Sequence, residues 1–170
     1  PRYPTFAPDG KKLAYQQVGP IGTQDFTVHV LDLDTGESTR LRSAPRIWPG
    51  RMSWSADSQN ITVAELARTS TRLSDGRNRL VTINIETDSS RIENLTAELS
   101  PDAGPVASPD GKKLALIFDG ALWTVPIGAN GSINGPPELR LDELVESPAW
   151  HADNQHISIL TSNGLETVNI

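Results

Sequence analysis

Histidine and cysteine are the side chains that most often act as general bases, nucleophiles or metal ligands, and this chain has few of them. It contains three histidines and no cysteine. His29 lies in an alternating segment, His151 precedes a turn, and His156 opens the next apolar segment. None belongs to a His-x-His or His-x-x-x-His pair, and the lack of cysteine excludes disulfides, thiolate catalysis and zinc–thiolate sites. We therefore predict structural roles for all three histidines.

The carboxylates offer no clear chemical site either. The sequence has no Gly-x-Ser-x-Gly elbow, phosphate-binding loop or dinucleotide fingerprint. Acidic residues gather before two expected strands, where they could hold a cation or a basic partner: Glu98 and Asp102, then Asp142, Glu143 and Glu146. Their spacing does not repeat as a ligand set would, so we interpret them as solvated loops. We expect residues 1–170 to contain no catalytic, cofactor-binding or metal-binding residue.

Binding is better supported than catalysis. The connector 65–78 is longer than a hairpin needs and holds Arg68, Arg72 and Arg77 in an otherwise acidic chain. Arginine suits bidentate contacts with carboxylates, and long loops on rigid scaffolds often carry recognition. Trp48 lies between two prolines in another long connector. We predict that these four residues contact a partner; the alternative is a solvated loop with incidental arginines.

Composition limits the kind of partner. The net charge is −6 and the isoelectric point is about 5.0, which argues against nucleic acid or an anionic membrane surface. No apolar run approaches the ~20 residues of a membrane-spanning helix, and no signal-peptide pattern opens the chain. We expect a protein or peptide partner, with no nucleic acid and no membrane insertion.

One short pattern occurs four times and organises the chain. It is written Pro-Asp-Gly around Asp9 and Asp110, and Ala-Asp-Ser or Ala-Asp-Asn around Asp57 and Asp153. The successive aspartates are 48, 53 and 43 residues apart. A period of about 40–50 residues built from strands and turns is typical of β-propeller blades.

Each copy predicts a hairpin turn. Pro8 and Pro109 fix φ at the second turn position, and Gly10 and Gly111 can adopt positive φ. The aspartate, present in all four copies, can accept backbone N–H bonds within the turn. We therefore predict that Asp9, Asp57, Asp110 and Asp153 are structural turn residues.

These units predict an all-β fold made of four-stranded antiparallel blades. We place the blades at residues 1–42, 43–97, 98–141 and 142–170, the last with only three strands. Because propellers avoid exposed edges by closing, we expect this segment to belong to a larger propeller of six or seven blades in a longer, multidomain chain. A closed four-bladed ring is the alternative.

The repeats resemble the TolB-type propeller repeat, a resemblance carried by Phe6-Ala-Pro-Asp-Gly-Lys-Lys-Leu-Ala-Tyr15 and Ala107-Ser-Pro-Asp-Gly-Lys-Lys-Leu-Ala115. It covers essentially the whole chain. It implies a non-catalytic scaffold that mediates protein or peptide interaction or gates access to a partner domain. It also implies a periplasmic or otherwise exported bacterial protein, with the cytoplasm as the alternative location.

A second resemblance concerns blades three and four. Leu122-Trp-Thr-Val-Pro-Ile127, the Gly/Asn-rich loop after it, and Glu146-Ser-Pro-Ala-Trp150 are similar to the propeller of bacterial propeller-fused amidohydrolases. This implies an accessory domain whose catalytic partner, with zinc or another divalent metal, lies outside these residues. Prolyl-oligopeptidase-type serine peptidases carry similar propellers and are a further alternative. Beyond Ile170, a His-x-His would favour the amidohydrolase and a Gly-x-Ser-x-Gly the peptidase.

Overall fold

All the regular structure that the computed structural model describes is β-strand. The described residues are 1–19, 26–41, 50–66, 78–93, 95, 104–118 and 120–170. The first two blades contain β1 (Arg2–Phe6), β2 (Lys12–Val18), β3 (Phe26–Asp32), β4 (Ser38–Leu41), β5 (Ser53–Trp54), β6 (Asn60–Leu66), β7 (Asn78–Asn84) and β8 (Ser90–Glu93). The last two contain β9 (Val106–Ala107), β10 (Lys113–Phe118), β11 (Ala121–Pro126), β12 (Glu138–Leu141), β13 (Val145–Trp150), β14 (His156–Thr161) and β15 (Gly164–Asn169).

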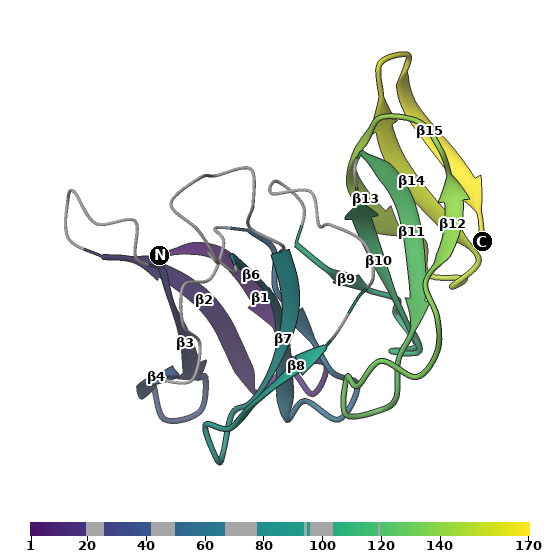
Figure 1. Ribbon diagram of the computed structural model, residues 1–170. Helices are drawn as coiled ribbons and strands as arrows, with labels where there is room; N and C mark the ends of the chain where they lie inside the picture. Colours follow the sequence, from purple (N-terminus) through teal and green to yellow (C-terminus); the bar gives the residue numbers. More distant parts are fainter. Residues whose placement is uncertain (20–25, 42–49, 67–77, 94, 96–103, 119) are drawn as a thin grey trace.

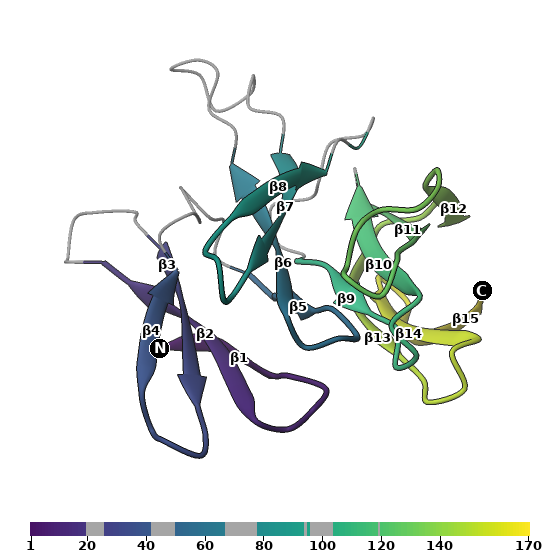
Figure 2. The ribbon, with the colours of Figure 1, turned by 90° about the horizontal axis from the view of Figure 1, so that it is seen from below.

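The strands form four separate antiparallel sheets, each following the chain order. Three sheets have four strands, β1–β4, β5–β8 and β9–β12, and the fourth has three, β13–β15. The sheets stand side by side in a row with blade 1 and blade 4 at opposite ends (Figures 1 and 2). The first strands are neighbours, because β1 contacts β5, β5 contacts β9 and β9 contacts β13. The predicted propeller fold is confirmed.

The hydrophobic core consists of the seams between blades. Each blade turns one face toward the preceding blade, here called its leading face, and the other toward the following blade, its trailing face. At the seam between blades 1 and 2, Val28 and Val30 meet Ile61, Val81 and Ile83. At the next seam Leu80 of blade 2 belongs to one buried cluster with apolar residues of β10 and β11, and the third seam buries β14 against blade 3. Period-two alternation thus buries both faces of the inner blades.

Tryptophans at one repeated position link adjacent blades. Phe6, Trp54, Ala107 and Trp150 hold the same place at the end of each first strand, opposite the first apolar residue of the second strand. Trp54 Nε1 donates to the carbonyl of Thr5 at 3.0 Å, and Trp150 Nε1 donates to that of Val106 at 2.9 Å. Both tryptophans therefore bridge adjacent blades, as the repeat pattern predicts.

Candidate functional site

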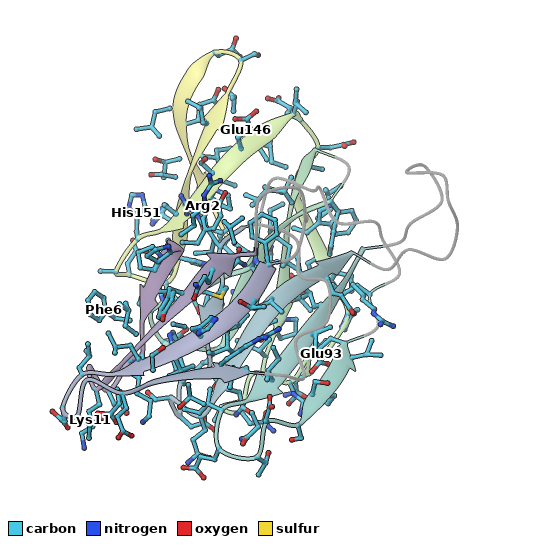
Figure 3. The ribbon with its side chains drawn as sticks, turned by 90° about the vertical axis from the view of Figure 1, so that its left-hand side faces the viewer. Arg2, Phe6, Lys11, Glu93, Glu146 and His151 are labelled. Atoms are coloured by element: carbon cyan, nitrogen blue, oxygen red, sulfur yellow. The ribbon has the colours of Figure 1, made fainter. Side chains whose placement is uncertain are left out.

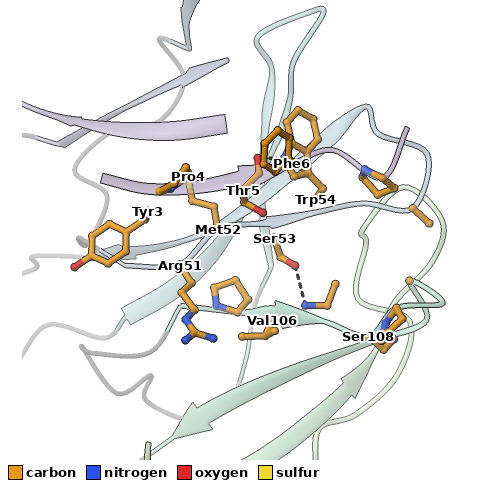
Figure 4. A pocket seen from close by; sticks show the side chains of 16 residues that line it. Tyr3, Pro4, Thr5, Phe6, Arg51, Met52, Ser53, Trp54, Val106 and Ser108 are labelled. Carbon is orange, nitrogen blue, oxygen red and sulfur yellow. Dashed lines mark hydrogen bonds between the residues drawn. The ribbon is translucent and has the colours of Figure 1, made fainter. Parts of the chain in front are cut away.

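A hollow of about 750 Å³ opens where the first strands of blades 1, 2 and 3 converge (Figure 4). Its walls are β1, β5 and β9 together with the start of the turn that follows each strand. Because these strands are the innermost of their blades, the hollow occupies the axial side of the propeller. Axial cavities of this kind are where a rigid ring of blades can present several repeats to one ligand.

The lining of the hollow is aromatic, proline-rich and nearly uncharged. Tyr3 and Phe6 are 39% and 66% exposed, whereas Trp54 is only 5% exposed and forms part of the wall. Four prolines complete the surface: Pro4, Pro8, Pro105 and Pro109. Such a surface can bury apolar groups while losing little side-chain entropy, because proline and aromatic side chains have few rotamers.

Arg51 is the one charged side chain among the described residues that line the hollow. Its Nη1 donates to the carbonyl oxygen of Pro148 in blade 4 at 3.1 Å, which fixes the guanidinium. A guanidinium has five N–H donors, so further donors can serve an incoming carboxylate. The hollow therefore combines an apolar floor with one oriented cation.

Hydrogen bonds across the seams hold the walls in place. The backbone N–H of Ala107 donates to Ser53 Oγ at 2.8 Å, linking blades 2 and 3 (Figure 4). Gln16 of blade 1 and the backbone of Gly50 exchange two bonds, at 3.1 and 3.3 Å. The Gln16 side chain is 1% exposed, so this pair forms a buried amide contact between blades 1 and 2.

The four repeated aspartates lie in the expected turns. Each accepts a bond from the backbone N–H two residues later, at distances between 2.9 and 3.1 Å: Asp9, Asp57, Asp110 and Asp153. The residue after each aspartate has a φ between 59° and 71°: Gly10, Ser58, Gly111 and Asn154. In even blades this residue also bonds across a seam, since Ser58 Oγ accepts from Asp9 N–H and Asn154 Oδ1 from Asp110 N–H.

The fourth turn should open on strong acidification. The Gln155 backbone N–H is the largest cause that lowers the pKa of Asp153 from 3.8 to about 2, followed by the bond from His156. The ionised carboxylate holds the turn, so its contribution is complete above pH 3.8 and is lost as the pH falls through about 2. Amide NMR shifts of Gln155 should titrate with a midpoint near pH 2 and lose that transition in Asp153→Asn. A midpoint near 3.8 would contradict this assignment.

The histidines form two local pairs but no catalytic triad among the described residues. His151 Nε2 lies 2.8 Å from Ser158 Oγ, and His156 Nδ1 lies 2.6 Å from Asp153 Oδ2. The two rings are 5.9 Å apart, a proximity that their separation in the sequence did not suggest. Since serine and carboxylate contact different imidazoles, the relay that activates a serine nucleophile is not assembled here.

His29 lies elsewhere, on the leading face of blade 1. It stacks on Tyr15 at 5.2 Å and shares a bond with Thr27 Oγ1. Burial, together with the nearby Arg40 guanidinium, lowers the pKa of His29. In the described part of the chain, no group of three His, Asp or Glu side chains is arranged to hold a metal ion.

The interaction residues predicted from sequence lie outside the described residues. These are Trp48, Arg68, Arg72 and Arg77, and the same holds for Glu98 and Asp102.

The sequence analysis did not predict the hollow. The lining residues share no motif, and only their positions relative to the repeat turns connect them. Tyr3, Arg51 and Pro105 each lie a few residues before a repeat turn, so aligning the repeats would have placed them at one end of adjacent first strands.

No helix within the described ranges is long and apolar enough to cross a membrane.

Comparison with known proteins supports the fold. No protein-family model and no curated protein matches the chain. Among solved structures, TolB from Acinetobacter baumannii is similar, with 20% identity and a TM-score of 0.70 over 99% of this chain and 42% of TolB. The β-propeller domain of the Trilobed protease from Pyrococcus furiosus has 16% identity and a TM-score of 0.60, covering 93% of this chain and 47% of that one.

A third similar structure is dipeptidyl peptidase 4 from Porphyromonas gingivalis. Its identity is 12% and its TM-score 0.59, over 94% of this chain and 29% of the peptidase. The chain thus spans less than half the length of these three proteins. The resemblance to TolB-type propellers is confirmed at the level of the fold.

Proposed function

We propose that this chain is a non-catalytic β-propeller scaffold that binds an extended segment of a protein partner in the hollow between β1, β5 and β9. The observation that carries the proposal is the hollow itself, with its exposed Tyr3 and Phe6 and its walls fixed across two seams. Proline-rich and extended peptides bind aromatic-lined grooves because they lose little conformational entropy on binding.

The chemistry of the lining favours an acidic segment. Arg51 supplies the positive charge, and no carboxylate is present among the described lining residues to compete for it. An apolar surround lowers the local dielectric constant, which strengthens a charge-assisted bond relative to one in water. A ligand that places one carboxylate at Arg51 and apolar or proline residues along Tyr3 and Phe6 would satisfy both features.

Replacing Arg51 with glutamine should weaken binding of acidic peptides by about tenfold or more, since a bond to a charged group contributes about 1.5–3 kcal/mol. The probes are fluorescein-labelled decapeptides that combine proline with glutamate, compared with the same peptides carrying glutamine. Fluorescence anisotropy gives the dissociation constants. Replacing glutamate by glutamine in the peptide removes the same charge pair from the other side. The glutamine peptides should therefore bind the wild-type protein about as weakly as the glutamate peptides bind the Arg51→Gln variant.

Arg40→Gln is the matched control, because Arg40 is exposed on β4, the outer strand of blade 1, and does not line the hollow. It removes the same charge and should leave peptide affinity unchanged. Equal losses for the two variants would show that net charge, and not the hollow, attracts the peptides. No binding of any peptide in the panel to wild-type protein would refute the proposal.

A second candidate is an accessory propeller of a hydrolase. Two of the similar structures come from a protease and a peptidase, and this supports a prolyl-oligopeptidase-type partner domain. The resemblance to amidohydrolase propellers supports the other version, in which zinc or another divalent metal belongs to the catalytic domain. Likeness to TolB supports an exported protein. Sequencing the reading frame beyond Ile170 distinguishes these candidates by the motif it encodes.

A further inference from the structure

At the seam between blades 2 and 3, the repeated aromatic position holds an alanine. Trp54 occupies this position at the seam between blades 1 and 2, and Trp150 occupies it between blades 3 and 4. Blade 3 has Ala107 there, in the same register, opposite Leu114. Both indoles reach a carbonyl of the preceding blade, which the methyl group of Ala107 is too short to do. An interior seam is therefore built without the side chain that fills its two neighbours.

The place of the missing indole opens into the hollow. The lining includes both sides of this seam, and none of these residues is larger than valine: Ser53 and Ala56 of blade 2, and Val106, Ala107 and Gly111 of blade 3. Ala107 itself is only half-buried. Toward the turn the seam closes, since a Cβ at Gly111 would lie 2.5 Å from the Ala56 Cβ. The hollow thus has a small side pocket that ends at the turn.

The neighbouring seams show which polar group accompanies an indole. Trp54 Nε1 donates to the carbonyl of Thr5 at 3.0 Å, and Trp150 Nε1 donates to that of Val106 at 2.9 Å. Both carbonyls belong to the residue before the aromatic position of the preceding blade. Ser53 is that residue in blade 2. Its carbonyl is the corresponding acceptor for an indole at this seam, and an alanine side chain has no N–H to offer it.

The two walls of the side pocket are fixed relative to each other. The N–H of Ala107 donates to Ser53 Oγ at 2.8 Å (Figure 4). Nearer the turn, the N–H of Asp57 in blade 2 donates to the carbonyl of Ala129 in blade 3 at 3.3 Å. Because these bonds already hold the blades in place, a ligand that fills the pocket pays little for ordering the protein.

Building on the proposed binding of an extended segment in the hollow, we propose that this segment carries a tryptophan whose indole occupies the seam between blades 2 and 3. The indole packs on Ala107 and donates its N–H to the carbonyl of Ser53. Tryptophan suits this position because it combines a large apolar ring with one donor. Arg51 lies two residues before Ser53, so the carboxylate that it binds should stand a few residues from the tryptophan in the partner.

A peptide panel tests the indole site. The probes are fluorescein-labelled decapeptides of proline and glutamate with a single tryptophan, phenylalanine or alanine two residues from a glutamate, compared by fluorescence anisotropy. The tryptophan peptide should bind the wild-type protein about tenfold or more tightly than the alanine peptide, because it buries an aromatic ring. It should bind about threefold or more tightly than the phenylalanine peptide, because it adds a hydrogen bond. Equal affinities would refute the indole site and leave the proposed function intact.

Ala107→Trp supplies the indole from the chain itself. This variant should bind the tryptophan peptide no more tightly than the alanine peptide, and its affinity for the alanine peptide should match that of the wild-type protein. Ala152→Trp is the matched control, because Ala152 is exposed and does not line the hollow. It follows His151, whose side chain projects at the edge of the molecule in Figure 3. A tryptophan preference that Ala107→Trp keeps, or that Ala152→Trp also loses, would refute the proposal.

Thermal unfolding tests the space in the seam without any peptide. Ala107→Trp should raise the melting temperature by about 2 °C or more, because its indole gains apolar contacts and a hydrogen bond, whereas Ala152→Trp should leave it unchanged. A lower melting temperature for Ala107→Trp would show that the seam has no room for an indole, and would refute the proposal whatever the peptides do. If Ala107→Trp is stabilised but no peptide binds the wild-type protein, the proposed function fails, and the tryptophan anchor fails with it.

Discussion

Replacing Trp54 with alanine should lower the free energy of unfolding by about 3–5 kcal/mol, the range for truncation of a buried aromatic side chain. Trp54 is 5% exposed and belongs to the apolar cluster that joins blades 1 and 2. Its Nε1 also donates to the carbonyl of Thr5 across the seam, so truncation leaves a cavity and removes a hydrogen bond between the blades. Urea unfolding followed by circular dichroism measures the loss.

Two companion variants separate packing from hydrogen bonding. Trp54→Phe keeps most of the ring but lacks the N–H donor, and should cost about 1 kcal/mol from the hydrogen bond plus a smaller packing loss. Trp150→Ala should cost less than Trp54→Ala, because Trp150 is only half-buried although it makes the equivalent bond to Val106. A loss below about 1 kcal/mol for Trp54→Ala would show that the seam does not depend on this side chain.

The sequence predicts the fold well because each blade is specified by a short local turn motif that recurs along the chain. The turn around Asp110 is readable from Pro109 and Gly111 alone, and the period between aspartates places every blade. Trp54 and Trp150 occupy equivalent positions of the repeat, three residues before its aspartate. The three strands of the last blade also follow from the pattern, since one turn after Leu160 is followed by a single apolar segment.

The candidate site resists prediction for a physical reason. The hollow is built from first strands, and two of these, β5 and β9, are only two residues long. Tyr3, Arg51 and Val106 are far apart in the sequence and become neighbours only when three blades stack. No local pattern marks Arg51, since its role depends on the Pro148 carbonyl of another blade.

The even-numbered turns show a related effect. Ser58 and Asn154 replace glycine at positive φ, which the sequence presents as an unfavourable choice for serine. In the structure their side chains accept the aspartate N–H of the preceding blade. The inter-blade bond offsets the local strain, and glycine could not supply it. The turns of blades 2 and 4 therefore accept a side-chain hydrogen bond from the preceding blade, whereas the glycines in the turns of blades 1 and 3 have no side chain that could do so.

Gly111→Ala should destabilise the protein by about 2–5 kcal/mol. Positive φ accounts for about 1–2 kcal/mol, and the close contact with Ala56 adds the cost of overpacking, about 1–3 kcal/mol. Gly10→Ala is the matched control, because its φ of 71° is close to the 67° of Gly111 while its surroundings are open. Gly10→Ala should therefore show the conformational cost alone, about 1–2 kcal/mol.

A double-mutant cycle identifies the contact itself. Ala56→Gly removes the methyl group that a Cβ at Gly111 would strike, so Gly111→Ala should cost about as much in that background as Gly10→Ala does in the wild type. Thermal and urea unfolding of the four proteins of the cycle give the coupling energy. Equal costs for Gly10→Ala and Gly111→Ala in the wild-type background would mean that the seam relaxes around the added methyl. In that case the positive φ of the turn would be the only reason for a glycine at this position.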